Sequence, residues 1–213
     1  MARKNLKNPG GETVGKSPRA GAAKRKRPVA ADRIKRTARD LFYREGIRAV
    51  GVDKIVSVAG VTKPSLYRSY PSKDELAVAY LRDYADYFWE RFNGGATRHP
   101  EDARAQVLGY LRGLAERSQQ KSYRGCGISN AAVEYPERDH PARAFAEEHK
   151  KELRARLAEM AKAMGARDPK QLGDGLLLLI EGSFLTGQLF GAAGPAASVV
   201  EIAERLIDAS CKR

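Results

Sequence analysis

A group of hydrogen-bonding side chains lies between residues 62 and 68. Its members are Thr62, Lys63, Ser65, Tyr67 and Arg68, and Pro64 lies among them as a further candidate for contact with DNA. A lysine can donate to O6 and N7 of guanine, and a serine hydroxyl can donate or accept a hydrogen bond at a base edge. Tyrosine and arginine side chains commonly contact phosphate oxygens. This group therefore favours recognition of DNA bases, provided that a helix presents it to a groove.

The residues just before this group show the spacing of a helix. Ile34, Ala38, Leu41 and Phe42 recur at steps of three and four, as residues on one helical face do. Gly46 can end that helix, because glycine adopts the left-handed conformation without strain. The sequence thus predicts a first helix that could support the group from behind.

Two shorter helices are predicted next. A second apolar face ends before Gly60 and consists of Val52, Ile55, Val56 and Ala59. Thr62 can cap a third helix by accepting a backbone N–H bond, and Pro64 fits that helix's first turn. We expect Leu66 to pack the third helix onto the first. Two short helices joined by a short turn with glycine are typical of a helix-turn-helix, whose second helix enters the major groove.

Further residues of this region are expected to contact DNA phosphates. They are Lys54, Arg68, Tyr70 and Lys73, and the two tyrosines Tyr67 and Tyr70 should also pack partly against the protein. The alternative for each basic residue is a solvated surface charge that contacts nothing.

The positive charge of the chain is concentrated near its start. The 213 residues have a net charge of +13. Residues 1–30 hold nine Lys or Arg and one Glu, residues 31–81 hold ten and six, and residues 82–213 hold twenty and nineteen. Segment 1–28, with few large apolar side chains, is predicted to be a disordered basic tail. It could follow phosphates or a minor groove, or add only non-specific attraction.

The rest of the chain is predicted to be helical, which makes the fold class all-α. Ser72 and Glu75 form a capping box at the start of a fourth helix, which should end near residues 93–95. Later helices are expected around 107–114, 126–134, 141–160, 169–191 and 195–207. We divide the chain into the tail (1–28), a helix-turn-helix domain (29–81) and a ligand-binding and dimerisation domain (82–213).

The segment 169–191 is expected at a subunit interface. Residues 176–180 are apolar around most of a helix, which indicates burial on more than one side. Small residues nearby would let another helix approach closely: Gly175, Gly182, Ser183 and Gly187. This helix is therefore predicted to lie at the subunit interface of a homodimer.

A ligand cavity is expected in the third segment, with mostly apolar walls and few polar groups. Its predicted walls are Phe88, Phe92, Leu111, Asn130, Phe145, His149 and Gln188, with Cys126 near the rim. Such a cavity favours an apolar or aromatic small molecule, since burying many hydroxyls requires many partners. Cys126 has two interpretations, a thiol that senses oxidants or electrophiles and a buried, inert side chain.

Several other functions find no support in the sequence. No paired carboxylates, nucleophile with a base, phosphate-binding glycine loop or metal-ligand spacing is present, so we expect neither an enzyme nor a cofactor. His140 and His149 alone are weak metal candidates. Two distant cysteines indicate a reduced, cytoplasmic protein. We expect no segment to reach the roughly 18–20 apolar residues of a membrane span, and therefore no membrane as a partner.

One family resemblance joins these patterns. Fixed spacings relate Phe42, Gly46, residues 52–55, residues 59–61, residues 65–67, Tyr70 and residues 72–76, and together they resemble the DNA-binding domain of the TetR family. The resemblance implies a bacterial, dimeric repressor that binds a pseudo-palindromic operator in double-stranded DNA and responds to a small-molecule effector. The chain departs from the family pattern before its second helix, where residues 48–52 lack a phosphate-binding hydroxyl. Two alternatives are a constitutive or architectural DNA-binding protein and a thiol sensor using Cys126.

Overall fold

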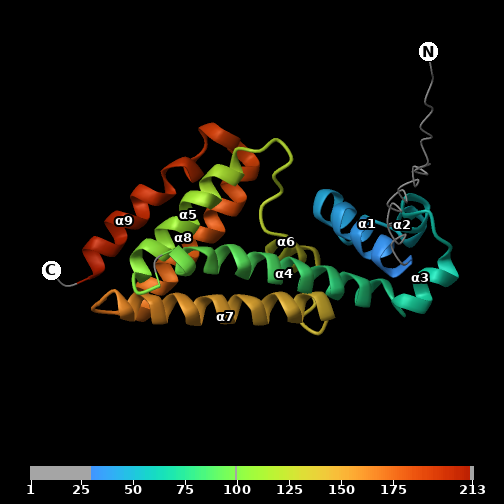
Figure 1. Cartoon of the computed structure of the whole chain (residues 1–213), viewed down its shortest axis with the longest axis horizontal. Coiled ribbons are helices and arrows are strands. Elements are labelled where there is room, and N and C mark those ends of the chain that lie inside the picture. The colour runs from blue at the N-terminus through green and yellow to red at the C-terminus, as the bar shows by residue number, and fades with distance from the viewer. Residues whose placement is uncertain (1–29, 99, 212–213) are drawn as a thin grey trace, which may run out of the picture.

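The computed structural model describes residues 30–98 and 100–211, and in that part the protein is built from helices without a β-strand (Figure 1). This confirms the predicted all-α class. The predicted basic tail lies outside the described residues. The helix-turn-helix head lies at one end of an elongated molecule, and the C-terminal helix lies at the other.

Three helices form the head: α1 (Ala30–Glu45), α2 (Val52–Ala59) and α3 (Lys63–Ser69). Gly46 and Gly60 follow the first two helices with φ of 94° and 61°, the left-handed conformation that glycine adopts without strain. The Thr62 side chain caps α3 by accepting from the backbone N–H of Ser65. Leu66 is fully buried, as predicted. The local rules of capping and apolar spacing therefore describe this head correctly.

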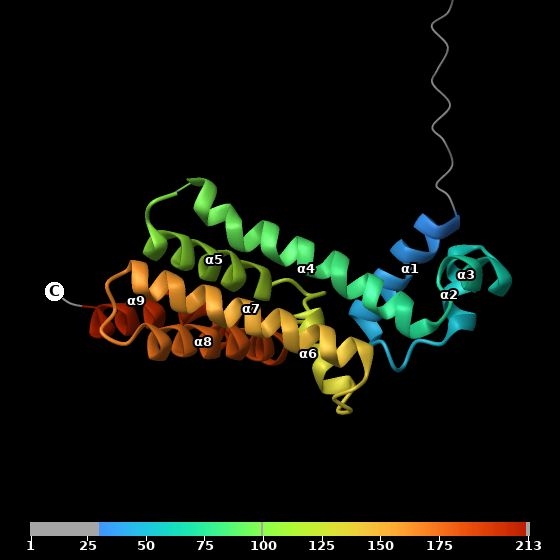
Figure 2. The ribbon, with the colours of Figure 1, turned by 90° about the horizontal axis from the view of Figure 1, so that it is seen from below.

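The helix α4 (Lys73–Arg98) runs from the head into the second domain (Figure 2). The Ser72 hydroxyl accepts from the backbone N–H of Glu75, as the capping box requires. The helix does not end near residues 93–95 as predicted but continues to Arg98. A glycine inside a helix costs only about 1 kcal/mol, so the two glycines there do not stop it.

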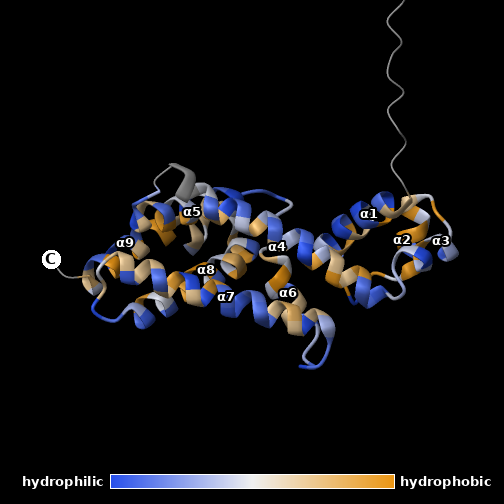
Figure 3. Ribbon diagram, turned by 60° about the horizontal axis from the view of Figure 1, so that its bottom comes forward, coloured by the Kyte–Doolittle hydropathy of each residue, from blue (hydrophilic) through white to orange (hydrophobic). Residues whose placement is uncertain are grey.

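The second domain contains the remaining helices, of which α5, α6 and α7 pack against α4. They are α5 (Ala103–Ser118), α6 (Gly127–Glu134), α7 (Pro141–Ala163), α8 (Pro169–Phe190) and α9 (Val199–Ser210). Helices α7 and α8 lie side by side (Figure 2). Two short 3₁₀ helices, Gly191–Ala193 and Pro195–Ser198, precede α9, so Pro195 opens a 3₁₀ turn rather than the last α-helix. Hydrophobic residues gather where the helices face one another (Figure 3).

The small residues of α8 serve contacts within the chain. A Cβ on Gly187 would lie 2.7 Å from the Ser118 Cβ, and one on Gly175 would lie 2.9 Å from Leu206. Ser183 is buried as well. The prediction that these residues face a second subunit is therefore wrong for all three. Gly182 alone of the four has open space around it.

The stretch Pro169–Ala193 is long and apolar enough to cross a membrane by length and composition alone, which differs from the sequence-based expectation. A core helix of a soluble protein passes the same test. This one packs against α5, α7 and α9, and its apolar residues Leu172, Leu176 and Ile180 are buried there. The neighbouring helices thus cover one apolar face of α8, while Leu178, Leu185 and Leu189 on another face stay exposed.

Candidate nucleic-acid interface and adjoining pocket

The exposed edge of α3 brings together most of the predicted base-reading residues. The exposed members are Thr62, Lys63, Pro64, Tyr67 and Arg68, and Ser65 is half-buried among them. Leu66, on the opposite side of the helix, anchors α3 to the head core. The geometry therefore presents one polar face at the start of a short helix, which is where a recognition helix contacts bases.

Lys63 is held at this edge by a neighbouring carboxylate. Its Nζ lies 2.7 Å from Asp53 Oδ1 of α2, and that contact raises the pKa of Lys63. Both side chains are exposed, and an ion pair in that position contributes little to stability. The lysine can therefore exchange this partner for DNA, while Asp53 keeps it near the start of α3 until it does.

The predicted phosphate contacts differ in how accessible they are. Lys54 is exposed and pairs with Glu45 of α1. Lys73 is half-buried and donates from Nζ to the Arg48 carbonyl oxygen at 3.3 Å, and burial lowers its pKa. Tyr70 is half-buried against the core. Lys73 and Tyr70 are therefore engaged with the head itself, and Lys54 is exposed but paired with Glu45. Arg68 is exposed without an ion pair among the described residues.

The N-terminus of α2 shows the departure noted in the sequence. Gly51 precedes the helix and provides no side-chain hydrogen bond. A phosphate at this position would have to be held by backbone N–H groups of the first turn, which the helix dipole makes favourable.

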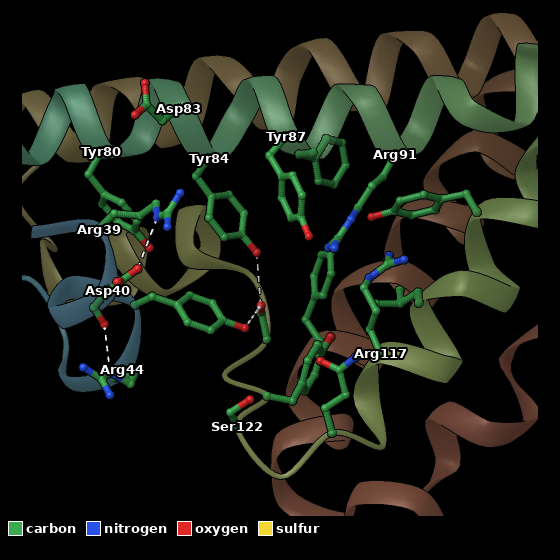
Figure 4. A pocket seen from close by; sticks show the side chains of 18 residues that line it. Arg39, Asp40, Arg44, Tyr80, Asp83, Tyr84, Tyr87, Arg91, Arg117 and Ser122 are labelled. Atoms are coloured by element: carbon green, nitrogen blue, oxygen red, sulfur yellow. Dashed lines mark hydrogen bonds and ion pairs between the residues drawn. The ribbon is translucent and has the colours of Figure 1, made fainter. Parts of the chain in front are cut away.

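A cavity of about 620 Å³ lies where the head meets the second domain (Figure 4). Residues of α1 form one side of it, and residues of α4, α5, α8 and the loop after α5 form the rest. This volume falls within the range of small-molecule sites. The cavity is thus a pocket shared between the DNA-reading part and the rest of the protein.

Tyrosine and arginine dominate the walls of this pocket. The tyrosines are Tyr43, Tyr80, Tyr84, Tyr87, Tyr110 and Tyr123, and the arginines are Arg39, Arg44, Arg91 and Arg117. Phe88, Leu114 and Phe184 add apolar surface. The pocket is aromatic and most of its lining surface is apolar, as expected, but the expectation of few polar groups is wrong, because four guanidinium groups and six tyrosine hydroxyls belong to its walls.

Only Phe88 of the eight predicted ligand residues lines the pocket. Phe92, Leu111, Cys126 and His149 are buried in the core, and Phe145 packs partly buried against it. Asn130 instead donates to the Arg124 carbonyl oxygen at 2.8 Å. The Gln188 amide lies close to Gly125. Most predicted wall residues therefore belong to the packing around the pocket.

The spacing along α4 contains a signal that could have identified the true wall. Tyr80, Tyr84, Tyr87 and Arg91 recur at steps of four, three and four, so they share one helical face. Phe92 follows Phe88 by four residues on a neighbouring face that points into the core. The two sets of aromatic residues therefore point in different directions about the helix axis, and residue type alone does not distinguish them.

A buried polar network, which the sequence did not reveal, lies behind Phe88 and Phe184. Lys150 Nζ is 2.7 Å from Glu181 Oε1 and 3.6 Å from Cys126 Sγ, and the Ser129 hydroxyl donates to Glu181 Oε2 at 2.7 Å. Burial disfavours the charge of Lys150, but Cys126 and Glu181 outweigh it and raise the pKa. Cys126 is fully buried, whereas cysteines that sense oxidants are partly exposed. This burial favours the inert interpretation.

His149 is packed among aromatic rings. Its ring centroid lies 4.8 Å from that of Phe88 and 5.2 Å from that of Trp89. Burial, with a smaller contribution from Lys150, lowers the pKa of His149 to about 4. In the part of the chain that the structure describes, no group of three His, Cys, Asp or Glu side chains could hold a metal.

Two sets of hydrogen bonds connect the head to the second domain. Tyr43 of α1 and Tyr84 of α4 both donate to the Gly125 carbonyl oxygen at 3.2 Å, and the Arg124 N–H donates to the Tyr43 hydroxyl at 3.0 Å. Both tyrosines are also pocket walls. A molecule in the pocket would thus touch the residues that fix α1 to the loop.

The second set joins the end of α6 to the turn after α1. The Glu134 carboxylate accepts from the backbone N–H of Arg48 at 2.8 Å, and Arg48 Nη1 donates to the Glu134 carbonyl oxygen at 2.9 Å. A Cβ on Gly46 would meet the same carboxylate at 3.2 Å. These hydrogen bonds attach the head to the second domain at two places. A shift of α6 would therefore move the turn that leads to α2.

Comparison with known proteins identifies the head. Residues 34–80 match the family model described as bacterial regulatory proteins, tetR family. The HTH-type transcriptional regulator RutR of Escherichia coli is 36% identical over 75 residues, which are 35% of this chain and 32% of RutR. The activator FasR of Mycolicibacterium smegmatis is 43% identical over 49 residues, 23% of this chain and 22% of FasR. These matches span about a third or less of each curated relative.

The similarity in structure extends over both domains. A TetR-family transcriptional regulator from Streptomyces coelicolor superposes with a TM-score of 0.78 and 29% sequence identity, over 86% of this chain and 96% of the other. The family model covers the helix-turn-helix, and the structural similarity extends to the helical domain behind it. The head therefore matches the DNA-binding region of the tetR family, and the chain has the fold of a TetR-family transcriptional regulator.

Proposed function

We propose that this protein is a ligand-responsive transcriptional repressor that binds a pseudo-palindromic operator as a homodimer and is released by a small-molecule effector. It acts in the cytoplasm and catalyses no reaction. The observation that carries the proposal is the pocket of about 620 Å³ between α1 of the head and the helices of the second domain. A cavity at that junction gives a small molecule direct access to the DNA-reading part.

The DNA-binding half of the proposal is supported by the exposed face of α3. In a two-fold symmetric dimer, two such helices would enter successive major grooves about 34 Å apart. We expect Thr62, Lys63 and Ser65 to read bases, and Lys54 and Arg68, which are both exposed, to contact phosphates. The recognition surface therefore serves sequence-specific binding better than general DNA packaging.

The dimer is supported by an exposed stripe on the last two helices. On α8, Leu178, Leu185 and Leu189 are 73%, 58% and 65% exposed and share one face with Gly182. These positions follow one another at steps of four, three and four, the spacing of a helix seam. A second exposed row begins at Ser198, just before α9, and continues on α9 through Ile202, Arg205 and Ala209. A second copy of the chain would cover both rows in a four-helix bundle.

Release would follow from unequal binding to two states. A ligand shifts the equilibrium only if it binds one arrangement of the heads more tightly than the other. The pocket walls Tyr43 and Tyr84 hold the loop at Gly125, so an occupant that displaces either one would move α1 relative to α4. The two α3 helices of the dimer would then no longer match the spacing of the grooves.

The DNA-binding half is tested by selecting duplexes from a random-sequence pool with the full chain. On the selected duplex, Lys63→Ala should weaken binding by about 1–3 kcal/mol, the value of a good base contact. Its effect on an unrelated duplex should be smaller. Lys170→Ala, an exposed lysine at the start of α8, is the matched control and should change neither affinity. A pool without a shared sequence, or equal effects of the two substitutions, would show that α3 is not the reader.

A further inference from the structure

Two guanidinium groups lie on the side of the pocket formed by the second domain. Arg91 of α4 and Arg117 of α5 approach it from neighbouring helices (Figure 4). Neither forms an ion pair with a carboxylate in residues 30–98 or 100–211. Each lies over an aromatic ring instead: Arg91 Cζ is 3.6 Å from the centroid of Tyr87, and Arg117 Cζ is 5.8 Å from that of Tyr110. Their planar faces are therefore packed, while their hydrogen-bonding edges remain available.

The positive charge at this side is not neutralised by the other walls. The two carboxylates of the pocket, Asp40 of α1 and Asp83 of α4, already pair with Arg39 at 3.2 Å and Lys35 at 3.0 Å. Burial and the nearby charge of Arg117 both lower the pKa of Arg91. Two like charges in a partly buried place repel each other, and an anion between them would relieve that repulsion.

A third polar group points to the same kind of ligand. The Tyr123 hydroxyl, from the loop after α5, is buried and has no hydrogen-bond partner among the described residues. It belongs to the wall of the same pocket. A buried hydroxyl without a partner costs free energy, so a ligand oxygen that accepts its hydrogen bond would be bound favourably.

We propose that this pocket binds a small aromatic carboxylate, with Arg91 and Arg117 at the carboxylate and the tyrosine rings around its aromatic body. Guanidinium groups fit a carboxylate with paired hydrogen bonds, and aromatic rings pack well against tyrosine. The inference depends on the proposed function in one respect, which is that the carboxylate is the effector that releases DNA. It also changes the expected effector from an apolar compound to an anionic one.

The test compares aromatic acids with their uncharged amides, which have nearly the same shape. The probes are benzoate, naphthalene-2-carboxylate and biphenyl-4-carboxylate, each with its carboxamide, titrated calorimetrically into the full chain. At least one acid should bind about tenfold or more tightly than its amide, because charge-assisted hydrogen bonds are roughly twice as strong as neutral ones. Arg117→Gln and Arg91→Gln should each remove most of that preference, and Arg117→Lys should retain part of it.

Arg112→Gln is the matched control, because Arg112 is an exposed arginine of the same helix α5 and does not line the pocket. It should keep the full preference for the acid. The inference is overturned if no acid binds better than its amide, or if Arg91→Gln and Arg117→Gln keep the preference as Arg112→Gln does. Binding to the selected duplex is measured separately, with and without the acid. A preference for the acid without any effect on DNA would support the anion site and count against the proposed release mechanism.

Discussion

His149 carries a ring nitrogen, Nε2, that is buried and has no hydrogen-bond partner within the described residues. The rings of Phe88 and Trp89 surround it, so a protonated imidazolium would be poorly solvated there. The pKa of about 4 in the folded protein lies well below the ordinary value near 6.5. Between these two values the unfolded chain binds more protons than the folded one.

The protein should therefore lose stability as the pH falls from about 6.5 towards 4, because the unfolded state gains the proton first. For His149 the slope is at most about 1.4 kcal/mol per pH unit. Urea unfolding at pH 7 and pH 5 should show a larger loss for the wild type than for His149→Phe, which keeps an apolar ring in place. His140→Asn, a half-buried histidine at the start of α7, is the control and should behave as the wild type. Equal losses in His149→Phe and the wild type would contradict this assignment.

Single residues also show where sequence reasoning succeeds and where it fails. Thr62, Ser72 and Leu66 were predicted correctly because capping and apolar spacing involve residues only a few positions apart. The pair Lys150 and Glu181 was not predicted, because the partners are 31 positions apart and meet only when α7 packs on α8. The prediction of the pocket walls was wrong for the same reason, since four helices and one loop contribute residues to them.

At the scale of elements, α8 was correctly predicted as a helix, but burial on more than one side is not seen in the protomer, where Leu178 and Leu185 are exposed. Its small residues were also assigned to the wrong partners. The periodicity shows that Gly175 and Gly187 can accept a close neighbour, and it cannot show which neighbour. In the structure α9 and α5 occupy those places. The remaining apolar surface of α8, the stripe through Leu178, Gly182 and Leu185, is what a second subunit can cover.

Gly182→Arg tests this interface. The glycine has open space around it, so the substitution should leave the protomer folded and place a charge in the centre of the stripe, where burial without a partner is costly. Sedimentation should show monomers for Gly182→Arg at concentrations where the wild type is a dimer. Gly109→Arg, at a helix position of α5 that is equally open, serves as the matched control and should remain dimeric. An intact Gly182→Arg dimer would place the interface elsewhere.

At the scale of the whole molecule, the pocket and the attachments of the head form one connected region. Tyr43 and Tyr84 are pocket walls and also donate to the Gly125 carbonyl oxygen, while Arg48 and Glu134 connect the head to α6. The family resemblance implied a sensor behind the head. The structure adds that the cavity is formed partly by α1 itself, so a molecule in it contacts the DNA-binding domain directly.

The central claim, that filling this pocket releases DNA, can be tested without knowing the effector. Ser122 is exposed at the pocket wall, and Ser122→Cys in a Cys211→Ser background gives one accessible thiol while Cys126 stays buried. Benzyl methanethiosulfonate would attach a ring that can enter the pocket, and the methyl reagent would attach a group too small to fill it. Mass spectrometry confirms a single modification in each case.

The affinity of the modified protein for its selected duplex is the decisive measurement. The benzyl adduct should bind that duplex about 5–150-fold more weakly, the usual range of coupling between two sites. The methyl adduct should bind it as the unmodified variant does, and reduction of the disulfide should restore the affinity of the benzyl adduct. A fully modified benzyl adduct that binds the duplex as tightly as the methyl adduct would contradict the claim.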